Sequence, residues 1–236
     1  MLCLLGAVGL PGVLDVAKSF LGIPYVGGTL ESDGEECLIV DTMGMDCTTF
    51  VELSVARFLA ARDSSFAFEQ HVQRLRYRHG EVDGYLSRLH YFTDWAERNV
   101  QGGVWRELGP EEDDGYMWRF DTLMLNYMSN HPDSYPYLKA NAWAVDSMRL
   151  IEKQYLCYPF RYIDKSYLDL PPDRLPIRDG DILALVTTIE GLDVTHLGFA
   201  VWQGEKLHLM HASMKHGKVV IDERTLYDYL KTRKGC

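Results

Sequence analysis

The stretch Met45-Asp46-Cys47-Thr48-Thr49-Phe50-Val51-Glu52 leads directly into the periodic apolar residues 53–59 and predicts a helix that begins at a cysteine. Asp46 suits the N-cap position, and apolar side chains recur at helical spacing from Phe50 to Leu59. The Cys47 thiol then lies at the positive end of a helix, where unpaired backbone N–H groups favour the thiolate. The charge of Asp46 opposes this effect, so a reactive thiol also needs a cationic partner. On this stretch alone, Cys47 is better explained as a small buried hydrophobe, as most free cysteines are.

The composition excludes several classes of protein. The chain has 236 residues, of which 47% are hydrophobic, so it can bury a full core and is neither disordered nor fibrous. Its formal net charge of −10 argues against a nucleic-acid partner, because phosphate binding requires a basic face. The five cysteines form no C-x-x-C pair, which argues against a zinc knuckle or a thioredoxin-like motif.

The first ten residues are apolar but too few for a membrane-spanning helix, which needs about 20. They are either the remnant of a secretory signal or an ordinary buried segment, since no positive residue precedes Lys18. Helical spacing follows from Gly12 to Leu21, and helical patterns also dominate residues 66–152. We therefore expect a single domain over residues 1–236, with a mainly helical insertion at about 63–175.

The last quarter of the chain alternates apolar and polar residues, which predicts four strands joined by glycine-containing turns as an antiparallel meander, at residues 181–189, 194–202, 207–213 and 218–221. If Gln203-Gly204 is the loop of the second hairpin, His196 lies directly opposite His211. Such side chains have Cβ atoms about 5 Å apart, so one imidazole can orient the other. His196 also shares a face with Gly198 and Ala200, whose small side chains leave room for the start of the Cys47 helix.

Cys47, His196 and His211 together have the layout of a cysteine hydrolase, with a thiol, a base and a group that orients the base. Backbone N–H groups of the first helical turn, beginning with that of Cys47, would bind the oxyanion. The same three side chains could instead hold a zinc ion, because cysteine and histidine are its usual ligands. The two histidines could also be a hydrogen-bonded pair without chemistry.

The motifs resemble those of the NlpC-type, papain-like cell-wall hydrolases. The segment 46–51 is similar to their Asp-Cys-Ser-Gly-Phe-Val signature. Four further segments follow in the family's order: Leu21-Gly22-Ile23-Pro24-Tyr25, Asp179-Gly180-Asp181-Ile182, Thr195-His196-Leu197-Gly198 and Met210-His211-Ala212-Ser213. Thr48-Thr49 in place of Ser-Gly, the segment 87–95 and the long insertion resemble, more narrowly, the N-acetylmuramoyl-L-alanine amidase-like branch, first catalogued as a domain of unknown function.

This resemblance implies an α+β, papain-like fold, in which a helical N-terminal part packs on the C-terminal antiparallel sheet. It makes Cys47 the nucleophile, His196 the base and His211 the orienting residue, and it places the phenol of Tyr25 at the site. The insertion would shape a substrate groove. Its segment 87–95 supplies candidates for binding a sugar or a peptide carboxylate, namely Arg88, His90, Tyr91 and Trp95, which from sequence alone are equally typical of a helix packing aromatics on a core.

The activity implied is cysteine-dependent hydrolysis of the amide between N-acetylmuramic acid and L-alanine in peptidoglycan fragments (muropeptides), during cell-wall turnover or recycling. We expect a monomer that needs no cofactor or metal and acts in the periplasm or cell envelope, with no nucleic-acid partner and no transmembrane segment. One alternative is a γ-D-glutamyl-diamino acid endopeptidase acting on the stem peptide. Another is a catalytically silent cell-wall-binding module that retains the fold.

Overall fold

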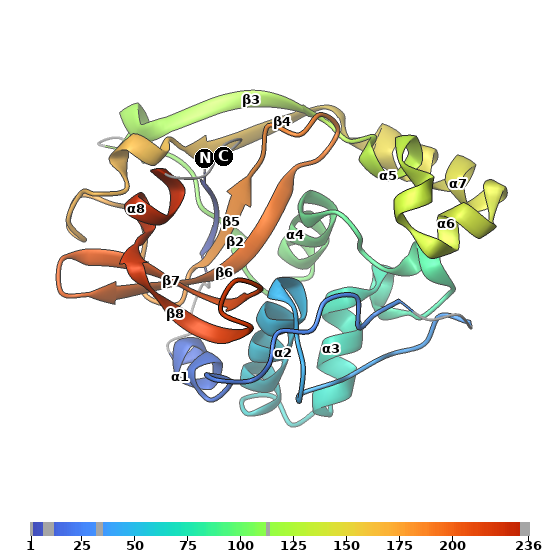
Figure 1. The fold of residues 1–236 in the computed structure, drawn as a ribbon, viewed down its shortest axis with the longest axis horizontal. Helices are drawn as coiled ribbons and strands as arrows, with labels where there is room; N and C mark the ends of the chain where they lie inside the picture. The colour runs from blue at the N-terminus through green and yellow to red at the C-terminus, as the bar shows by residue number, and fades with distance from the viewer. Residues whose placement is uncertain (1, 7–11, 32–34, 112–113, 232–236) are drawn as a thin grey trace.

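The computed structural model describes residues 2–6, 12–31, 35–111 and 114–231, and shows one antiparallel sheet with helices on both faces (Figure 1). Within these residues the sheet has eight strands in the order β3-β4-β1-β5-β6-β7-β8, with β2 paired to β1 beside this path. The strands are β1 (Leu2–Gly6), β2 (Arg106–Glu107), β3 (Trp118–Met124), β4 (Leu156–Ile163), β5 (Ile182–Val186), β6 (Val194–Gln203), β7 (Lys206–Ser213) and β8 (Lys218–Thr225).

The helices form three groups around the sheet (Figure 1). On one face lie α1 (Val13–Lys18), α2 (Cys47–Ala60), α3 (Phe68–Arg76) and α4 (Phe92–Gln101). The short helix α8 (Leu226–Lys231) covers the other face. A separate cluster contains α5 (Tyr127–Asn130), α6 (Pro136–Ala140) and α7 (Ala142–Glu152). No helix in the described parts of the chain is long and apolar enough to cross a lipid bilayer.

Helix α2 begins where the sequence predicts, and its start is fixed by a capping box. The Asp46 carboxylate accepts hydrogen bonds from the backbone N–H groups of Thr48 (3.1 Å) and Thr49 (2.9 Å). In return, the Thr49 hydroxyl accepts one from the Asp46 N–H (2.9 Å), which completes the reciprocal arrangement. One turn on, Phe50 packs edge-on against Phe199 of β6, with ring centroids 5.5 Å apart. The first turn of α2 is thereby held against the sheet.

The C-terminal meander is confirmed, but the β6–β7 hairpin turns at Gly204-Glu205 rather than at Gln203-Gly204. Gln203 pairs with Lys206, and Gly204 takes a φ of +61°, a left-handed conformation that two-residue hairpin turns require. The predicted register was therefore wrong by two residues. Because a shift of two keeps every side chain on its face, His196 and His211 become diagonal instead of direct neighbours.

Residues 63–175, predicted as a mainly helical insertion, contain two long strands that the sequence did not predict. β3 and β4 pair along almost their whole lengths, and β1 joins β4 to β5, so the insertion and the meander share one sheet. β3 is an edge strand, exposed at most positions, so it lacks the apolar alternation that marks a half-buried strand. Residues 66–152, where helical patterns dominate the sequence, are thus only partly helical: Met124 ends β3, and the one α-helix within residues 66–89 is α3, which short 3-10 turns follow.

Candidate active site

The structure brings Cys47 and His196 to the same cavity. Cys47 is the first residue of α2, and its half-buried sulfur accepts a hydrogen bond from the backbone N–H of Leu197, the residue after His196 on β6. All three residues line one cavity of about 120 Å³. The predicted thiol therefore lies beside the strand that carries the first predicted imidazole.

The pKa of the Cys47 thiol is raised to about 11, the opposite of the direction expected from its place at a helix start. Burial of the sulfur is the largest cause, because it removes the water that would stabilise a thiolate, and the nearby Asp46 carboxylate adds to it. Hydrogen bonds from the Leu197 N–H and the Thr48 hydroxyl act in the other direction but are outweighed. The thiol on its own is thus protonated at neutral pH, and a base must take its proton.

His196 and His211 are in direct contact, as predicted, although by a different register. Nε2 of His196 lies 2.5 Å from Nδ1 of His211, and the two rings are perpendicular. His211 is 1% exposed, and Tyr229 of α8 packs edge-on against its ring at 5.5 Å. The His211 ring is therefore fixed from both sides.

This contact bears on the zinc alternative. Two nitrogens bound to one tetrahedral zinc ion lie about 3.3 Å apart, since each Zn–N distance is about 2.0 Å. The nitrogens that face each other here are closer than that, at hydrogen-bond distance, which leaves no room for a zinc ion between them. In the described residues, no group of three or more histidine, cysteine, aspartate or glutamate side chains is arranged to hold a metal ion.

Gly198 permits the contact between His196 and His211, but not because it makes room for the start of α2, as we expected. A Cβ atom at this position would lie 2.5 Å from the Met210 carbonyl oxygen and 3.1 Å from Cβ of His211. Ala200, on the same face, packs in the cluster that includes α8. The small residues of β6 therefore make room for β7 and the α8 layer, not for the start of α2.

We expect Gly198→Ala to destabilise the fold by about 2 kcal/mol, because backbone atoms of β7 must move to admit the added methyl group. Urea or thermal denaturation measures the change. The matched control is Gly102→Ala at the end of α4, where the nearest atom to the new Cβ is 3.4 Å away and the helical φ suits alanine. Equal stability of the two variants would contradict the tight approach of β6 and β7.

Asp222, on β8, extends the row of catalytic candidates, and the sequence analysis missed it. One of its carboxylate oxygens lies 3.8 Å from Nε2 of His211. Asp222 is 2% exposed; burial alone would raise its pKa, but two hydrogen bonds from the Arg224 guanidinium, at 2.9 and 2.8 Å, help to hold it at about 2. The predicted strand ended at residue 221, whereas β8 continues to Thr225 and so includes Asp222. Had the predicted strand extended further, it would have placed Asp222 and Arg224, two positions apart, on one face of the strand. An acid paired with an arginine in this way is a sequence signal for an ionised carboxylate.

Tyr25 lies near the thiol, as the resemblance implied. Its segment runs beside the residues before α2, with backbone hydrogen bonds from Met45 to Pro24 and from Val26 to Met45, both 3.1 Å. The pKa of Tyr25 is raised first by burial and then by negative charge at Cys47 and Asp46. Its phenol is thus within electrostatic reach of the Cys47 sulfur.

Of the four candidates from segment 87–95, three line the cavity of Cys47: His90, Tyr91 and Trp95. Arg88 does not; it is 5% exposed, and its guanidinium binds the Glu31 carboxylate and the Leu30 carbonyl oxygen. This ion pair leaves Arg88 holding a neighbouring loop, which is a different role from the predicted grip on a sugar or carboxylate.

The lining residues of this segment are also engaged with the protein. The Tyr91 hydroxyl donates to Glu152 of α7 at 2.7 Å, and Nε2 of His90 is 2.9 Å from the Tyr85 carbonyl oxygen. Burial is the main cause that lowers the pKa of His90 to about 3, so it is neutral at physiological pH. Trp95 is 2% exposed and packs on Trp105. These side chains therefore form a rigid wall of the cavity.

A family model described as N-acetylmuramoyl-L-alanine amidase-like matches residues 15–236. The chain belongs to this family. An N-acetylmuramoyl-L-alanine amidase from Bacteroides uniformis has a similar structure, with 37% identity, a TM-score of 0.85, and coverage of 97% of this chain and 95% of that one. A Bacteroides fragilis protein provisionally named a xylanase is 40% identical, with a TM-score of 0.83 over 94% of this chain and 96% of its own.

A protein from Legionella pneumophila shares the fold at 21% identity, with a TM-score of 0.66 over 96% of this chain and 85% of that one. No curated protein matches the chain. The family is one of amidase-like peptidoglycan hydrolases, so the family predicted from the motifs is confirmed and the chain is placed among hydrolytic enzymes.

Proposed function

We propose that the chain is a cysteine-dependent amidase that hydrolyses the bond between N-acetylmuramic acid and L-alanine in muropeptides. One observation carries the proposal: Cys47 and His196 line one cavity, and Nε2 of the His196 ring contacts Nδ1 of His211. Similarity to an amidase from B. uniformis supports the choice of bond. The NlpC-type, papain-like arrangement and a role in envelope turnover or recycling belong to the same proposal.

The row Asp222–His211–His196 sets which ring nitrogens carry protons. Asp222 stays ionised above its pKa of about 2, so it favours a proton on Nε2 of His211. Nδ1 of His211 then accepts a proton from Nε2 of His196. This leaves Nδ1 of His196 as the basic nitrogen. Asp222 acts here as a positioning residue, through His211.

In the proposed reaction, Nδ1 of His196 takes the Cys47 proton as the sulfur attacks the lactyl carbonyl carbon. Thr48 and Thr49 N–H groups are occupied by the Asp46 carboxylate, so the Cys47 N–H is the first-turn donor for the oxyanion. The C–N bond then breaks, and the L-alanine nitrogen leaves with the proton from His196. Water attacks the thioester, which releases the muramyl carboxylate and the free thiol.

The site favours amide cleavage over the glycosidic cleavage suggested by the name of the B. fragilis neighbour. Most glycosidases require two carboxyl groups that flank the bond. Among the described residues that line the cavity of Cys47, the one carboxylate is Asp193, which is 2% exposed. Its oxygens accept hydrogen bonds from the backbone N–H groups of Thr93 and Val194, both at 2.7 Å.

We expect purified muramyl-tripeptide to be split into N-acetylmuramic acid and a peptide that begins with L-alanine, identified by mass spectrometry. The same tripeptide without the sugar contains no lactyl amide and should remain intact. Release of an L-alanyl-γ-D-glutamate dipeptide from the sugar-free tripeptide would establish the endopeptidase alternative instead. Binding of muramyl-tripeptide without any cleavage, undiminished after alkylation of Cys47, would identify a silent binding module.

A further inference from the structure

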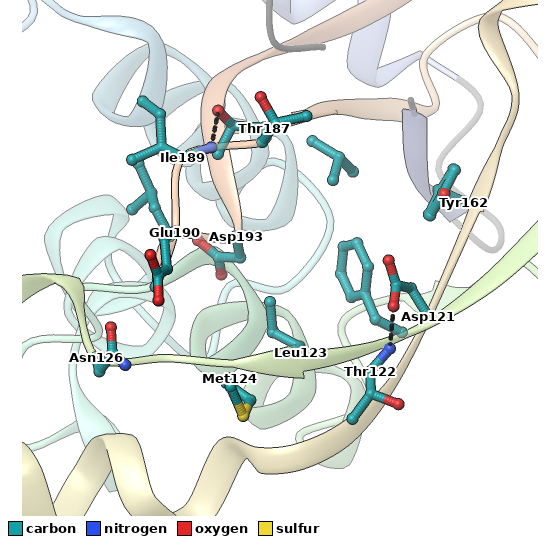
Figure 2. A pocket seen from close by; sticks show the side chains of 15 residues that line it. Asp121, Thr122, Leu123, Met124, Asn126, Tyr162, Thr187, Ile189, Glu190 and Asp193 are labelled. Carbon is teal, nitrogen blue, oxygen red and sulfur yellow. Dashed lines mark hydrogen bonds between the residues drawn. The ribbon is translucent and has the colours of Figure 1, made fainter.

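A second cavity, of about 220 Å³, is drawn in Figure 2 and borders the cavity of Cys47. The two share Leu192 and Asp193, which belong to the loop between β5 and β6. This loop forms one wall of the second cavity, and β3 and β4 of the insertion form the other. The second cavity is therefore separated from the cavity of Cys47 only by the segment that contains Leu192 and Asp193.

The sheet directs alternate side chains of β3 into this cavity. Asp121 and Leu123 point inward, whereas Thr122 and Met124 lie on the other side of the strand (Figure 2). The Asp121 carboxylate charge helps to raise the pKa of Tyr162, after burial, which places it near the phenol. Phe160 of β4 pairs with Asp121 and is 7% exposed, so its ring forms part of the buried base.

At the end of the cavity away from Tyr162, Gly191 is in contact with the segment that contains Asn126. Backbone N–H groups of Asn126 and Tyr127 both donate to the Gly191 carbonyl oxygen, at 3.1 and 3.0 Å. Gly191 has a φ of +79°, and a Cβ atom there would lie 2.0 Å from the Asn126 side-chain oxygen. Only glycine permits this contact. Glu190, exposed at this end, makes no hydrogen bond or ion pair with the residues that the structure describes.

The chemistry of the lining distinguishes the two halves of a muropeptide. The described lining residues include three acids (Asp121, Glu190 and Asp193), several hydroxyl groups and two aromatic rings, but no lysine, arginine or histidine. The stem peptide carries carboxylates, which the exposed Asp121 and Glu190 repel, whereas burial raises the pKa of Asp193 and disfavours its charge. The muramyl ring is neutral, because its lactyl carboxyl group is tied up in the scissile amide. Its hydroxyl groups can donate to carboxylates, and its C–H face can pack on an aromatic ring.

We propose that this second cavity is the saccharide subsite, which binds the neutral N-acetylated amino sugar of the substrate. This rests on the proposed function for the reacting bond, and it deepens that proposal by assigning the sugar to the β3–β4 side of Cys47. The insertion thus selects the substrate through strands β3 and β4, while the segment 87–95 forms the wall at the thiol.

The first test fills the cavity with Asp121→Trp. Tryptophan is tolerated well in strands, and Asp121 is exposed on an edge strand, so the fold should persist. We expect KM for muramyl-tripeptide to rise about tenfold or more, because the indole ring occupies the space of the sugar and the Asp121 carboxylate is lost. Loss of one good polar contact has an effect of this size. Glu190→Gln, which adds no bulk, should raise KM by a smaller factor. The matched control is Glu205→Trp, in the exposed β6–β7 turn, which removes the same charge and adds the same ring.

A second test needs no turnover. Isothermal titration of Cys47→Ala protein with N-acetylmuramic acid amide, a neutral sugar probe, should show binding that Asp121→Trp abolishes and Glu205→Trp leaves intact. If wild type cleaves muramyl-tripeptide but Asp121→Trp leaves both KM and sugar binding unchanged, the subsite is wrong and the amidase proposal stands. If wild type cleaves nothing yet the sugar binds in an Asp121-dependent way, the proposed reaction fails and the subsite stands. Binding of free diaminopimelate in place of the sugar would overturn the subsite.

Discussion

Cys47→Ala is expected to lower turnover of muramyl-tripeptide by at least about 10³-fold, as loss of a nucleophile does in other hydrolases. The sulfur forms the covalent bond in the proposed reaction, and no other described thiol lines the cavity. The change removes one half-buried atom, so the free energy of unfolding should fall by only about 1 kcal/mol. Steady-state kinetics and urea denaturation measure the two effects.

The matched control is Cys37→Ala, since Cys37 is a free and exposed thiol away from the cavity, and we expect full activity from it. Activity of Cys47→Ala within tenfold of wild type would refute the nucleophile assignment. The raised pKa of Cys47 also predicts how the rate of thiol alkylation depends on pH. Its reaction with iodoacetamide should be slow at pH 7 and rise as pH approaches the pKa of about 11. If the rate of alkylation instead reached a plateau below pH 8, Cys47 would already be a thiolate at neutral pH.

The helix start could be predicted from sequence because its causes are local. Asp46 and Thr49 are three residues apart, and a capping box needs no information from elsewhere in the chain. The pKa of Cys47 could not be predicted in the same way. Its direction depends on how much water the sulfur loses, which is decided by the contact with β6, 150 residues later.

For the two histidines, the sequence predicted the strand face correctly although it misplaced the strand pairing. The hairpin turn was misplaced, yet the error was an even number of residues, so His196 and His211 stayed on one face and in contact. Strand β3 escaped prediction because an edge strand that is exposed at most positions carries no apolar alternation, and β4, inside the sheet, is exposed or half-buried at six of its eight positions. The second cavity, which these strands build, could therefore not be predicted from the sequence. The only substrate-binding candidates in the predicted insertion were those of segment 87–95.

The last prediction concerns the row of side chains behind the thiol. His196→Ala should be as inactive as Cys47→Ala, because no other described residue takes the thiol proton in the proposed reaction. His211→Asn should keep part of the activity, since an amide oxygen can still accept from Nε2 of His196 and hold its ring. Asp222→Asn should lower kcat by about 10- to 100-fold, the usual effect of a residue that acts through another.

A pH profile separates positioning by Asp222 from a merely structural role. The carboxylate stabilises protonated imidazole in the row, so Asp222→Asn should move the acid limb of kcat/KM to lower pH as the base loses its proton more readily. The control is Glu223→Gln, the exposed acid next to it on β8, which should leave the profile unchanged. A drop in kcat for Asp222→Asn with an unmoved acid limb would show that Asp222 only supports the fold. A fully active His211→Asn, with no change in profile, would remove His211 from the mechanism and the row with it.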